Sequence, residues 1–175
     1  MPKLLIVVDF QRDFVDGALG FPGAAALDSR IAEKIEGYRK AGDQILFTFD
    51  THGKDYMYTQ EGKNLPVPHC EKGSEGWKLY GQVAKAYREG DVCLEKCTFG
   101  SDLLLSYLKE HPFDSIELVG VVSNICVISN AVIAKAAQPE TPVVVDARCV
   151  GSGDEALHNK ALDVMEGLQI EIINR

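Results

Sequence analysis

Short apolar runs rich in β-branched residues recur along the chain, and they constrain its fold more than any other feature. The runs lie at residues 4–8, 44–49, 92–94, 116–122, 143–145 and 170–173. Most of them are apolar at nearly every position rather than at alternate positions, as is typical of parallel strands covered on both faces. The pattern therefore predicts a mostly parallel sheet of about six strands.

Stretches with helical periodicity separate these strands, at residues 25–41, 75–89, 101–110, 124–137 and 154–167. Strands that alternate with helices indicate βαβ units and a doubly wound α/β fold. A chain of 175 residues, of which 46% are hydrophobic, suits one domain with a substantial core. We therefore expect a single domain over residues 1–175, with a Rossmann-like sheet and helices on both of its faces.

The charge and the cysteine content limit the partners and the compartment. A net charge of −8, with acidic residues scattered along the chain, argues against binding to nucleic acid or anionic membranes. The apolar run near the N-terminus is too short for a membrane span, and acidic residues follow it at once. Five cysteines without paired spacing indicate free thiols in a reducing compartment, so we expect a cytoplasmic protein. Cys93 and Cys149 are expected to be small buried hydrophobes.

Reactive side chains follow the predicted strands, and in an open α/β sheet ligands bind at these carboxyl ends. Asp9 directly follows the run 4–8, where burial would raise its pKa and suit it to proton transfer. Lys96 ends the segment that begins at residue 92, where its ammonium could hold a carboxylate ionised. More ordinary interpretations stay open, because Asp9 could cap a turn or helix and Lys96 could be a surface charge.

Cys126 lies in the first turn of the predicted helix 124–137, which is apolar on nearly every face. Backbone NH groups and the helix dipole at such a position lower a thiol pKa and can form an oxyanion hole. A small buried hydrophobe is the alternative interpretation. Cysteine nucleophiles usually work with a histidine, yet no histidine falls near Cys126 in the predicted fold. If Cys126 is catalytic, Asp9 is the carboxylate that a parallel sheet would bring beside it.

A polar loop at residues 51–73 is longer than the roughly 12 to 15 residues beyond which an unstructured connection is usually functional or disordered. It contains His52 and His69, and Asp50 directly precedes it. Asp50 and His52 lie on the same side of an extended chain, which is a suitable spacing for two metal ligands. Solvated loop histidines are the alternative.

The motifs VVDFQRDF, TFDTH, VPHCEKGSEGW, EKCTFGS and GVVSNICV span nearly the whole chain. In this order and spacing they resemble the isochorismatase-like cysteine hydrolases, a superfamily that includes the nicotinamidases. The resemblance implies a catalytic triad of Asp9, Lys96 and Cys126. It also implies a cis peptide between Val121 and Val122, which would turn the NH of Val122 toward that of Cys126 to form the oxyanion hole.

Nicotinamidases also bind a divalent metal through an Asp-x-His pair and a later histidine. The resemblance therefore implies Asp50, His52 and His69 as ligands, with Glu61 matching the carboxylate ligand of some nicotinamidases. The metal is expected to be zinc, with iron and manganese as alternatives, because a mixed nitrogen and oxygen ligand set suits all three.

The loop departs from the family pattern at two places. Thr51, His52 and Gly53 stand where Trp-His-Pro is typical, and Pro66 replaces an aromatic residue shortly before the later histidine. Phe14 matches an aromatic residue that packs on the substrate ring, although a core role is the alternative. Phe99 is a second expected contact of the substrate, and Trp77 a weaker one.

The expected function is metal-dependent hydrolysis of a small amide by a cysteine, with nicotinamide as the leading substrate. The product would be nicotinate, formed with ammonia through a thioester. The alternatives are another hydrolase of the superfamily, such as an N-carbamoyl amidase or an isochorismatase, a catalytically silent small-molecule-binding protein, or an interaction scaffold. Relatives commonly self-associate, so a homo-oligomer is expected.

Overall fold

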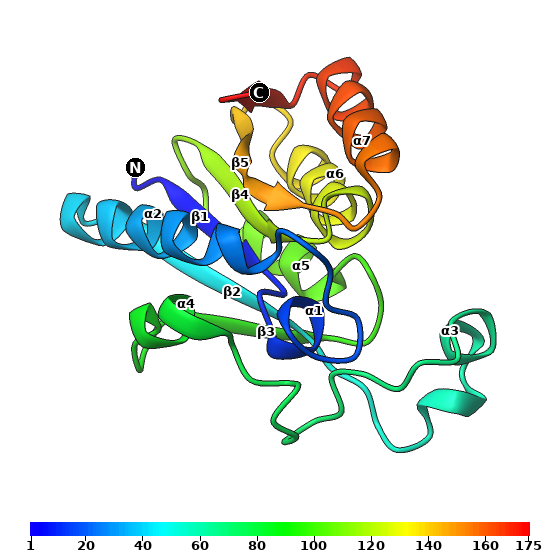
Figure 1. The fold of residues 1–175 in the computed structure, drawn as a ribbon. Helices are drawn as coiled ribbons and strands as arrows, with labels where there is room; N and C mark the ends of the chain where they lie inside the picture. Colours follow the sequence, from blue (N-terminus) through cyan, green and yellow to red (C-terminus); the bar gives the residue numbers. More distant parts are fainter.

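The computed structural model describes residues 1–175 and contains one six-stranded sheet, ordered β3-β2-β1-β4-β5-β6 (Figure 1). Every neighbouring pair of strands is parallel. The predicted α/β fold is therefore confirmed. The strands are β1 (Leu4–Val8), β2 (Gln44–Asp50), β3 (Val92–Lys96), β4 (Ile116–Val121), β5 (Val143–Gly151) and β6 (Glu171–Ile173).

Helices cover both faces of the sheet, as predicted. One face packs against α2 and α4, and the other packs against α5, α6 and α7. None of the helices combines the length and the apolarity that a membrane span requires. The helices are α1 (Arg12–Val15), α2 (Asp28–Ala41), α3 (Gln60–Asn64), α4 (Gly81–Ala86), α5 (Asp102–Glu110), α6 (Ile128–Ala137) and α7 (Glu155–Gly167).

Strand β1 shows why the central runs are continuously apolar. Its side chains alternate between two hydrophobic cores, with Leu4, Ile6 and Val8 in one and Leu5 and Val7 in the other. All of them are fully buried. Burial of each such side chain contributes about 1.5–3 kcal/mol, which favours this strand at the centre of the sheet.

The predicted helix at 75–89 is wrong, because only Gly81–Ala86 is helical. The preceding residues pair with the segment that follows β1 instead. The N–H groups of Arg12 and Tyr80 donate to the carbonyls of Lys78 and Phe10, at 2.9 and 3.0 Å. These long-range hydrogen bonds satisfy backbone groups that a helix would otherwise pair locally, and they fix the chain beside the strand end that carries Asp9.

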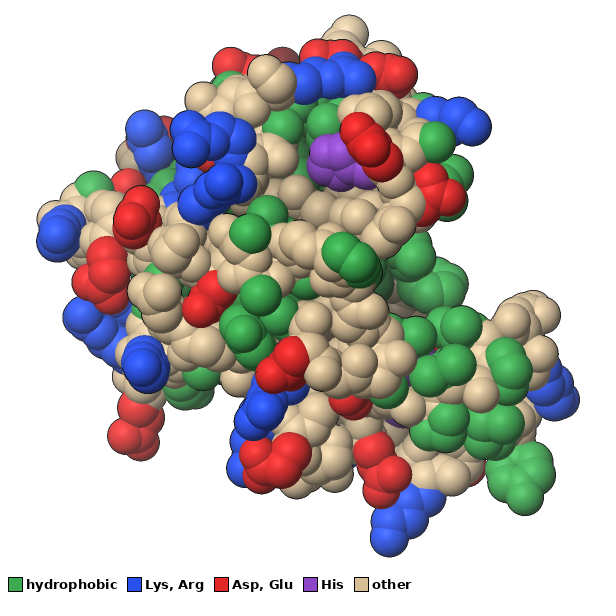
Figure 2. Space-filling model, in the orientation of Figure 1, with side chains coloured by type: hydrophobic (Ala, Val, Ile, Leu, Met, Phe, Trp, Pro, Cys, Tyr) green, Lys and Arg blue, Asp and Glu red, His purple; other side chains and the backbone are tan.

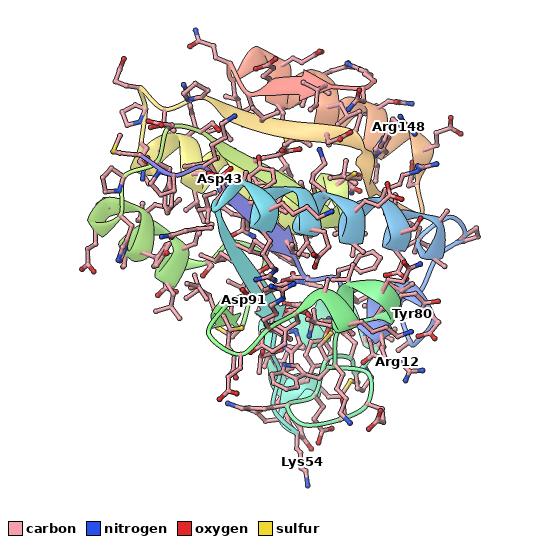
Figure 3. The ribbon with its side chains drawn as sticks, turned by 90° about the vertical axis from the view of Figure 1, so that its left-hand side faces the viewer. Arg12, Asp43, Lys54, Tyr80, Asp91 and Arg148 are labelled. Atoms are coloured by element: carbon pink, nitrogen blue, oxygen red, sulfur yellow. The ribbon has the colours of Figure 1, made fainter.

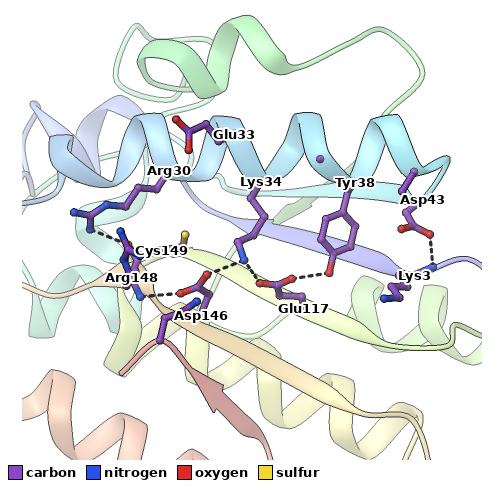
Figure 4. A pocket seen from close by; sticks show the side chains of 13 residues that line it. Lys3, Arg30, Glu33, Lys34, Tyr38, Asp43, Glu117, Asp146, Arg148 and Cys149 are labelled. Atoms are coloured by element: carbon purple, nitrogen blue, oxygen red, sulfur yellow. Dashed lines mark hydrogen bonds and ion pairs between the residues drawn. The ribbon is translucent and has the colours of Figure 1, made fainter.

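Strand β5 continues to Gly151, well beyond the predicted end at residue 145. Its pairing with β4 shifts register between Leu118 and Gly120. Polar residues in this part, among them Asp146, interrupt the apolar pattern and hide the strand in the sequence. Asp146 is tolerated there because Lys34 of α2 reaches it, with Nζ 2.7 Å from Oδ2 (Figure 4).

The free thiols are partly as predicted. Cys149 is buried, whereas Cys93 is exposed, so the prediction of a buried Cys93 is wrong. Cys93 lies on β3, which is the edge strand of the sheet and has alternately covered and exposed positions. A strand with one poorly covered face leaves every second side chain accessible.

Residues 51–73, here called the arm, extend beyond the edge of the sheet (Figures 1 and 3). The tip around Lys54 lies at the opposite end of the molecule from Arg148 (Figure 3). The arm is not wholly irregular, because it contains a short 3-10 helix (Tyr56–Tyr58) and α3. A hollow separates it from the body of the protein (Figure 2).

Candidate active site

Three predicted residues meet at the carboxyl ends of β1, β3 and β4. Lys96 Nζ lies 2.6 Å from Asp9 Oδ2 and donates a hydrogen bond to Cys126 Sγ at 3.6 Å. Asp9 is fully buried, and Lys96 and Cys126 are each 5% exposed. Thr48 Oγ1 on β2 donates to the other oxygen of Asp9, at 2.7 Å. The parallel sheet thus gathers an acid, an ammonium and a thiol in one buried cluster.

The charges in this cluster depend on one another. Burial raises the pKa of Asp9, and the Lys96 ammonium opposes that shift. Burial acts to lower the pKa of Lys96, but the nearby Asp9 and Cys126 outweigh it and hold the pKa above its usual range. Burial and the charge of Asp9 raise the pKa of the Cys126 thiol. The lowered thiol pKa expected from the sequence is therefore wrong, and a thiol that keeps its proton needs a base within reach.

The turn that carries Cys126 differs from the ordinary first helical turn that was predicted. Residues Ser123–Val127 form a π-helix, and α6 begins only at Ile128. The carbonyl of Val122 accepts hydrogen bonds from the N–H groups of Ile125 and Val127, both at 3.1 Å. Short π-helical segments occur frequently at functional sites.

The peptide bond between Val121 and Val122 is cis, as the family resemblance implies. Just before it, Gly120 has a φ of 112°. An ideal Cβ at Gly120 would lie 2.1 Å from the carbonyl oxygen of Val8, so only glycine allows β4 to approach β1 this closely. The backbone around Val122 is therefore fixed beside the strand end that carries Asp9.

Four predicted metal ligands converge next to this cluster. Asp50 ends β2, His52 and His69 lie on the arm, and Glu61 lies on α3; one ligand atom from each falls within 4.8 Å of the others. His52 Nε2 and His69 Nε2 lie 2.9 and 3.2 Å from Asp50 Oδ2. The same nitrogens lie 3.7 and 3.6 Å from Glu61 Oε1.

This arrangement fits a divalent metal ion. It offers two imidazole nitrogens and two carboxylate groups, the mixed donor set that zinc, iron and manganese accept. Burial acts to raise the pKa of Asp50, but hydrogen bonds from His52 and His69 lower it below its usual range. His69 Nδ1 donates to the carbonyl of Val67 at 2.7 Å, which leaves Nε2 directed at Asp50. A second hydrogen bond of this kind commonly orients a metal-binding histidine.

Gln11 supports the candidate site and was not predicted from the sequence. Its side chain is fully buried and pairs with the backbone of Asp50 in both directions: Nε2 donates to the carbonyl at 2.9 Å and Oε1 accepts from the N–H at 2.8 Å. Asp13 acts similarly on the arm, because its Oδ2 accepts from the N–H of Cys70, next to His69, at 2.8 Å. Their place in VVDFQRDF, directly after the first strand, was the available signal.

A pocket of about 340 Å³ joins the two clusters. Cys126, Asp50, His69 and Glu61 line it, together with the predicted Phe14 and Phe99. The ring of Phe14 packs edge-on against that of His69, with centroids 5.5 Å apart. Most of the remaining wall is apolar. Besides Val122, which was predicted for the oxyanion hole, it includes Leu19, Phe21, Leu65, Ile125 and Leu157, which were not predicted. A small apolar pocket with a few polar groups is typical of small-molecule sites.

Trp77 does not belong to this wall, so its weaker assignment as a substrate contact is not supported. Its indole packs on Phe49, with ring centroids 5.3 Å apart, and its Nε1 donates to Thr51 Oγ1 at 2.9 Å. His158 lies nearer to the site than expected, because its Nδ1 is 2.8 Å from Ser123 Oγ. It does not line the pocket that contains Cys126.

The fold and the site define a hydrolase of the isochorismatase superfamily. The family model for the isochorismatase domain matches residues 3–175, and the chain belongs to that family. It is 32% identical to an uncharacterized isochorismatase family protein, PncA, of Bacillus subtilis, with 93% of each chain covered. Neither likeness by itself assigns a substrate.

Solved structures extend the comparison. The pyrazinamidase/nicotinamidase of Streptococcus mutans superposes with a TM-score of 0.87 and 30% identity, over 98% of this chain and 99% of that one. The pyrazinamidase of Pyrococcus horikoshii, solved in complex with zinc, has the same fold, with a TM-score of 0.87 at 24% identity over 100% of both chains.

Proposed function

We propose that this protein is a metal-dependent cysteine amidohydrolase that converts nicotinamide and water to nicotinate and ammonia. The observation that carries the proposal is the meeting of two clusters on one pocket, the Asp9, Lys96 and Cys126 group and the four-ligand group around Asp50. The likeness to a pyrazinamidase/nicotinamidase at 30% identity supports it.

Asp50, His52, Glu61 and His69 would hold the metal, with zinc as the leading candidate and iron or manganese as alternatives. A bound divalent ion would supply a Lewis-acidic anchor that orients the ring nitrogen of the substrate. Phe14 and Phe99 line the pocket on which this site opens, so their rings are suited to contact an aromatic ring.

Formation of the thioester uses Asp9 as the base. Asp9 takes the proton of the Cys126 thiol, and the thiolate attacks the carbonyl carbon of the amide. The N–H groups of Val122 and Cys126 stabilise the oxyanion that forms. When this intermediate collapses, the C–N bond breaks, Asp9 returns its proton to the departing nitrogen, and ammonia leaves.

Hydrolysis of the thioester reverses these roles. Asp9 takes a proton from a water molecule, whose oxygen attacks the thioester carbon. The C–S bond breaks, nicotinate leaves, and Cys126 recovers a proton from Asp9. Lys96 contacts both Asp9 and Cys126, so its ammonium stabilises whichever of them carries the negative charge.

Self-association is also proposed, on the basis of apolar side chains exposed on the arm. Met57 is 43% exposed and Tyr58 is 81% exposed. Exposed apolar patches commonly mark protein interfaces. Sedimentation equilibrium of the wild-type protein and of Tyr58→Glu tests this proposal. We expect an oligomer for the wild type and a smaller mass for Tyr58→Glu, and the mass of a monomer for the wild type would exclude self-association.

The direct test of the substrate is ammonia release from nicotinamide by purified protein, before and after chelation and return of Zn²⁺, Fe²⁺ or Mn²⁺. We expect activity that chelation abolishes and that one of the metals restores. Hydrolysis of an N-carbamoyl amino acid or of isochorismate instead would assign a different reaction within the superfamily. No activity with any substrate under any metal condition, in a folded protein, would favour a silent binding protein.

A further inference from the structure

Asn130 is a buried polar residue that the proposed mechanism does not use. It lies on α6, one turn beyond Cys126, and its side chain is fully buried. Its Nδ2 donates to the carbonyl of Cys126 at 2.8 Å and to that of Phe99 at 3.1 Å. Its Oδ1 accepts from the N–H of Ser101 at 3.0 Å. A buried amide with all its contacts made in this way fixes the segments that it joins.

Asn130 contacts Phe99 and Ser101, the residues before and after Gly100 in the segment that joins β3 to α5. The carboxamide bonds the residues on both sides of Gly100, as a neighbouring strand would. Gly100 itself lies close to α6, because an ideal Cβ there would be 2.7 Å from Cδ1 of Ile133. Earlier in the segment, Lys96 Nζ donates to the carbonyl of Thr98 at 2.9 Å. The segment is therefore attached to the helix of the nucleophile and to Lys96.

The attachment has a consequence for the pocket. Phe99 lines both the pocket of Cys126 and the larger hollow beneath the arm, and its side chain is 44% exposed. Because nearly half of the side chain is exposed, the position of the ring depends strongly on its backbone. We propose that Asn130 is a positioning residue that holds the Phe99 wall at a set distance from Cys126, and so controls access of the substrate to the thiol. The substrate part of this inference rests on the proposed amidase function.

If Asn130 only stabilised the fold, its replacement would lower the Tm without affecting access to Cys126. Ser101 provides the matched control for such a purely structural role. Ser101 is buried in the same segment, and its Oγ caps α5 by accepting from the N–H of Leu104 at 3.1 Å. Ser101→Ala removes this cap but keeps the N–H that bonds to Asn130. It should lower the Tm of the protein without moving Phe99.

The test compares Asn130→Asp with Ser101→Ala in the metal-loaded enzyme. Asn130→Asp keeps the acceptor for Ser101 but loses both donated hydrogen bonds. We expect KM for nicotinamide to rise about tenfold, the factor that corresponds to one or two lost hydrogen bonds, while kcat changes less. The rate at which iodoacetamide alkylates Cys126, followed by mass spectrometry of its peptide, should rise because the thiol becomes more accessible. Ser101→Ala should leave both quantities unchanged.

A second variant protects the test against a failure of Asn130→Asp to fold. Asn130→Ala removes all three hydrogen bonds without placing a carboxylate in the buried site. It should reproduce the rise in KM and in alkylation. If Asn130→Asp or Asn130→Ala behaves like Ser101→Ala, the inference is overturned. Should wild type fail to hydrolyse nicotinamide, the alkylation rates alone still decide it.

Discussion

Two regions of the molecule place a lysine ammonium between two carboxylates, but the groups that surround the two lysines differ. In the first, Lys96 Nζ lies 2.6 Å from Asp9 and 3.7 Å from Asp50. In the second, Lys34 Nζ lies 2.5 Å from Glu117 and 2.7 Å from Asp146 (Figure 4). The ion pairs alone would not distinguish them.

The neighbours distinguish the two regions. Around Lys34 the remaining acceptors are satisfied, because the Tyr38 hydroxyl donates to Glu117 at 2.6 Å and the backbone N–H of Arg148 donates to Asp146 at 3.0 Å. Lys96, in contrast, contacts a thiol, and the cluster around it opens on a pocket beside two histidines.

The comparison also shows the limit of shifted pKa values as markers of function. Hydrogen bonds and charges from Asp146 and Glu117 outweigh burial and raise the pKa of Lys34, as Asp9 and Cys126 do for Lys96. Perturbed pKa values are common at active sites, but structural ion pairs perturb them as well. What marks the Lys96 region is a thiol within reach of the ion pair.

Within this comparison, the largest expected effect separates the two lysines by activity. Lys96→Met should lower kcat/KM for nicotinamide by on the order of 10³-fold, within the range of general acid–base contributions. Steady-state ammonia release measures this. The Asp9→Asn/Lys96→Met double variant removes both charges and should recover stability but no activity. Recovery of activity in the double variant would contradict the role of Asp9 as the base and would show that the lysine only balances its charge.

Lys34→Met should have the opposite profile. Removing the partly exposed Lys34 leaves two buried carboxylates uncompensated, which costs about 1–3 kcal/mol of unfolding free energy, less than for a fully buried pair. The kcat/KM should stay within about twofold of wild type, because the site does not include Lys34. Urea unfolding and ammonia release on the same preparation check both parts. A large loss of activity with unchanged stability would mean that the two regions are coupled.

The metal cluster should respond to the loss of a single ligand. His69→Ala should lower metal affinity and kcat/KM by about 100-fold or more, since even partners that only orient a ligand contribute 10- to 100-fold. His111→Ala is the matched control, because His111 is exposed and stacks on Tyr107 away from the cluster. Metal content by mass spectrometry and activity should fall together in the first variant only; equal behaviour of the two would remove His69 from the ligand set.

The smallest expected effect concerns acid stability. Burial acts to raise the pKa of Asp146, but hydrogen bonds from Lys34, the Arg148 backbone and Asn174, together with the charge of Lys34, outweigh it and hold the pKa below its usual range. The carboxylate therefore stabilises the folded state above its unfolded pKa of about 3.9, and this contribution disappears as the pH falls through the lower folded value. Urea unfolding between pH 7 and pH 3 should show a shallower loss of stability in Asp146→Asn than in wild type. Identical slopes would contradict this.

The sequence predicts the fold where burial is complete and local. The runs at β1 and β4 are continuous because both faces are covered, and this leaves a clear pattern. The end of β5 was missed because Lys34, far away in the chain, is what makes Asp146 acceptable there. The prediction of a helix at 75–89 was wrong because of contacts that are also distant in the chain, since the backbone of this segment pairs with residues after β1.

The candidate site follows the same division. Asp9, Lys96 and Asp50 could be predicted because each ends or directly follows a strand, and parallel strands end at one edge of the sheet. Gln11 and Asn130 were missed, because most of the backbone groups that they bond lie about 30 to 40 residues away in the chain. Side-chain contacts of that range leave no periodic signal.

The central claim is that Cys126, activated within the Lys96 cluster, is the nucleophile. The most direct measurement is ammonia release from nicotinamide by Cys126→Ala in the metal-loaded state, together with nicotinamide binding by calorimetry. We predict a loss on the order of 10⁴-fold or more in kcat with binding retained, as for other essential nucleophiles. Turnover close to that of wild type would contradict the account.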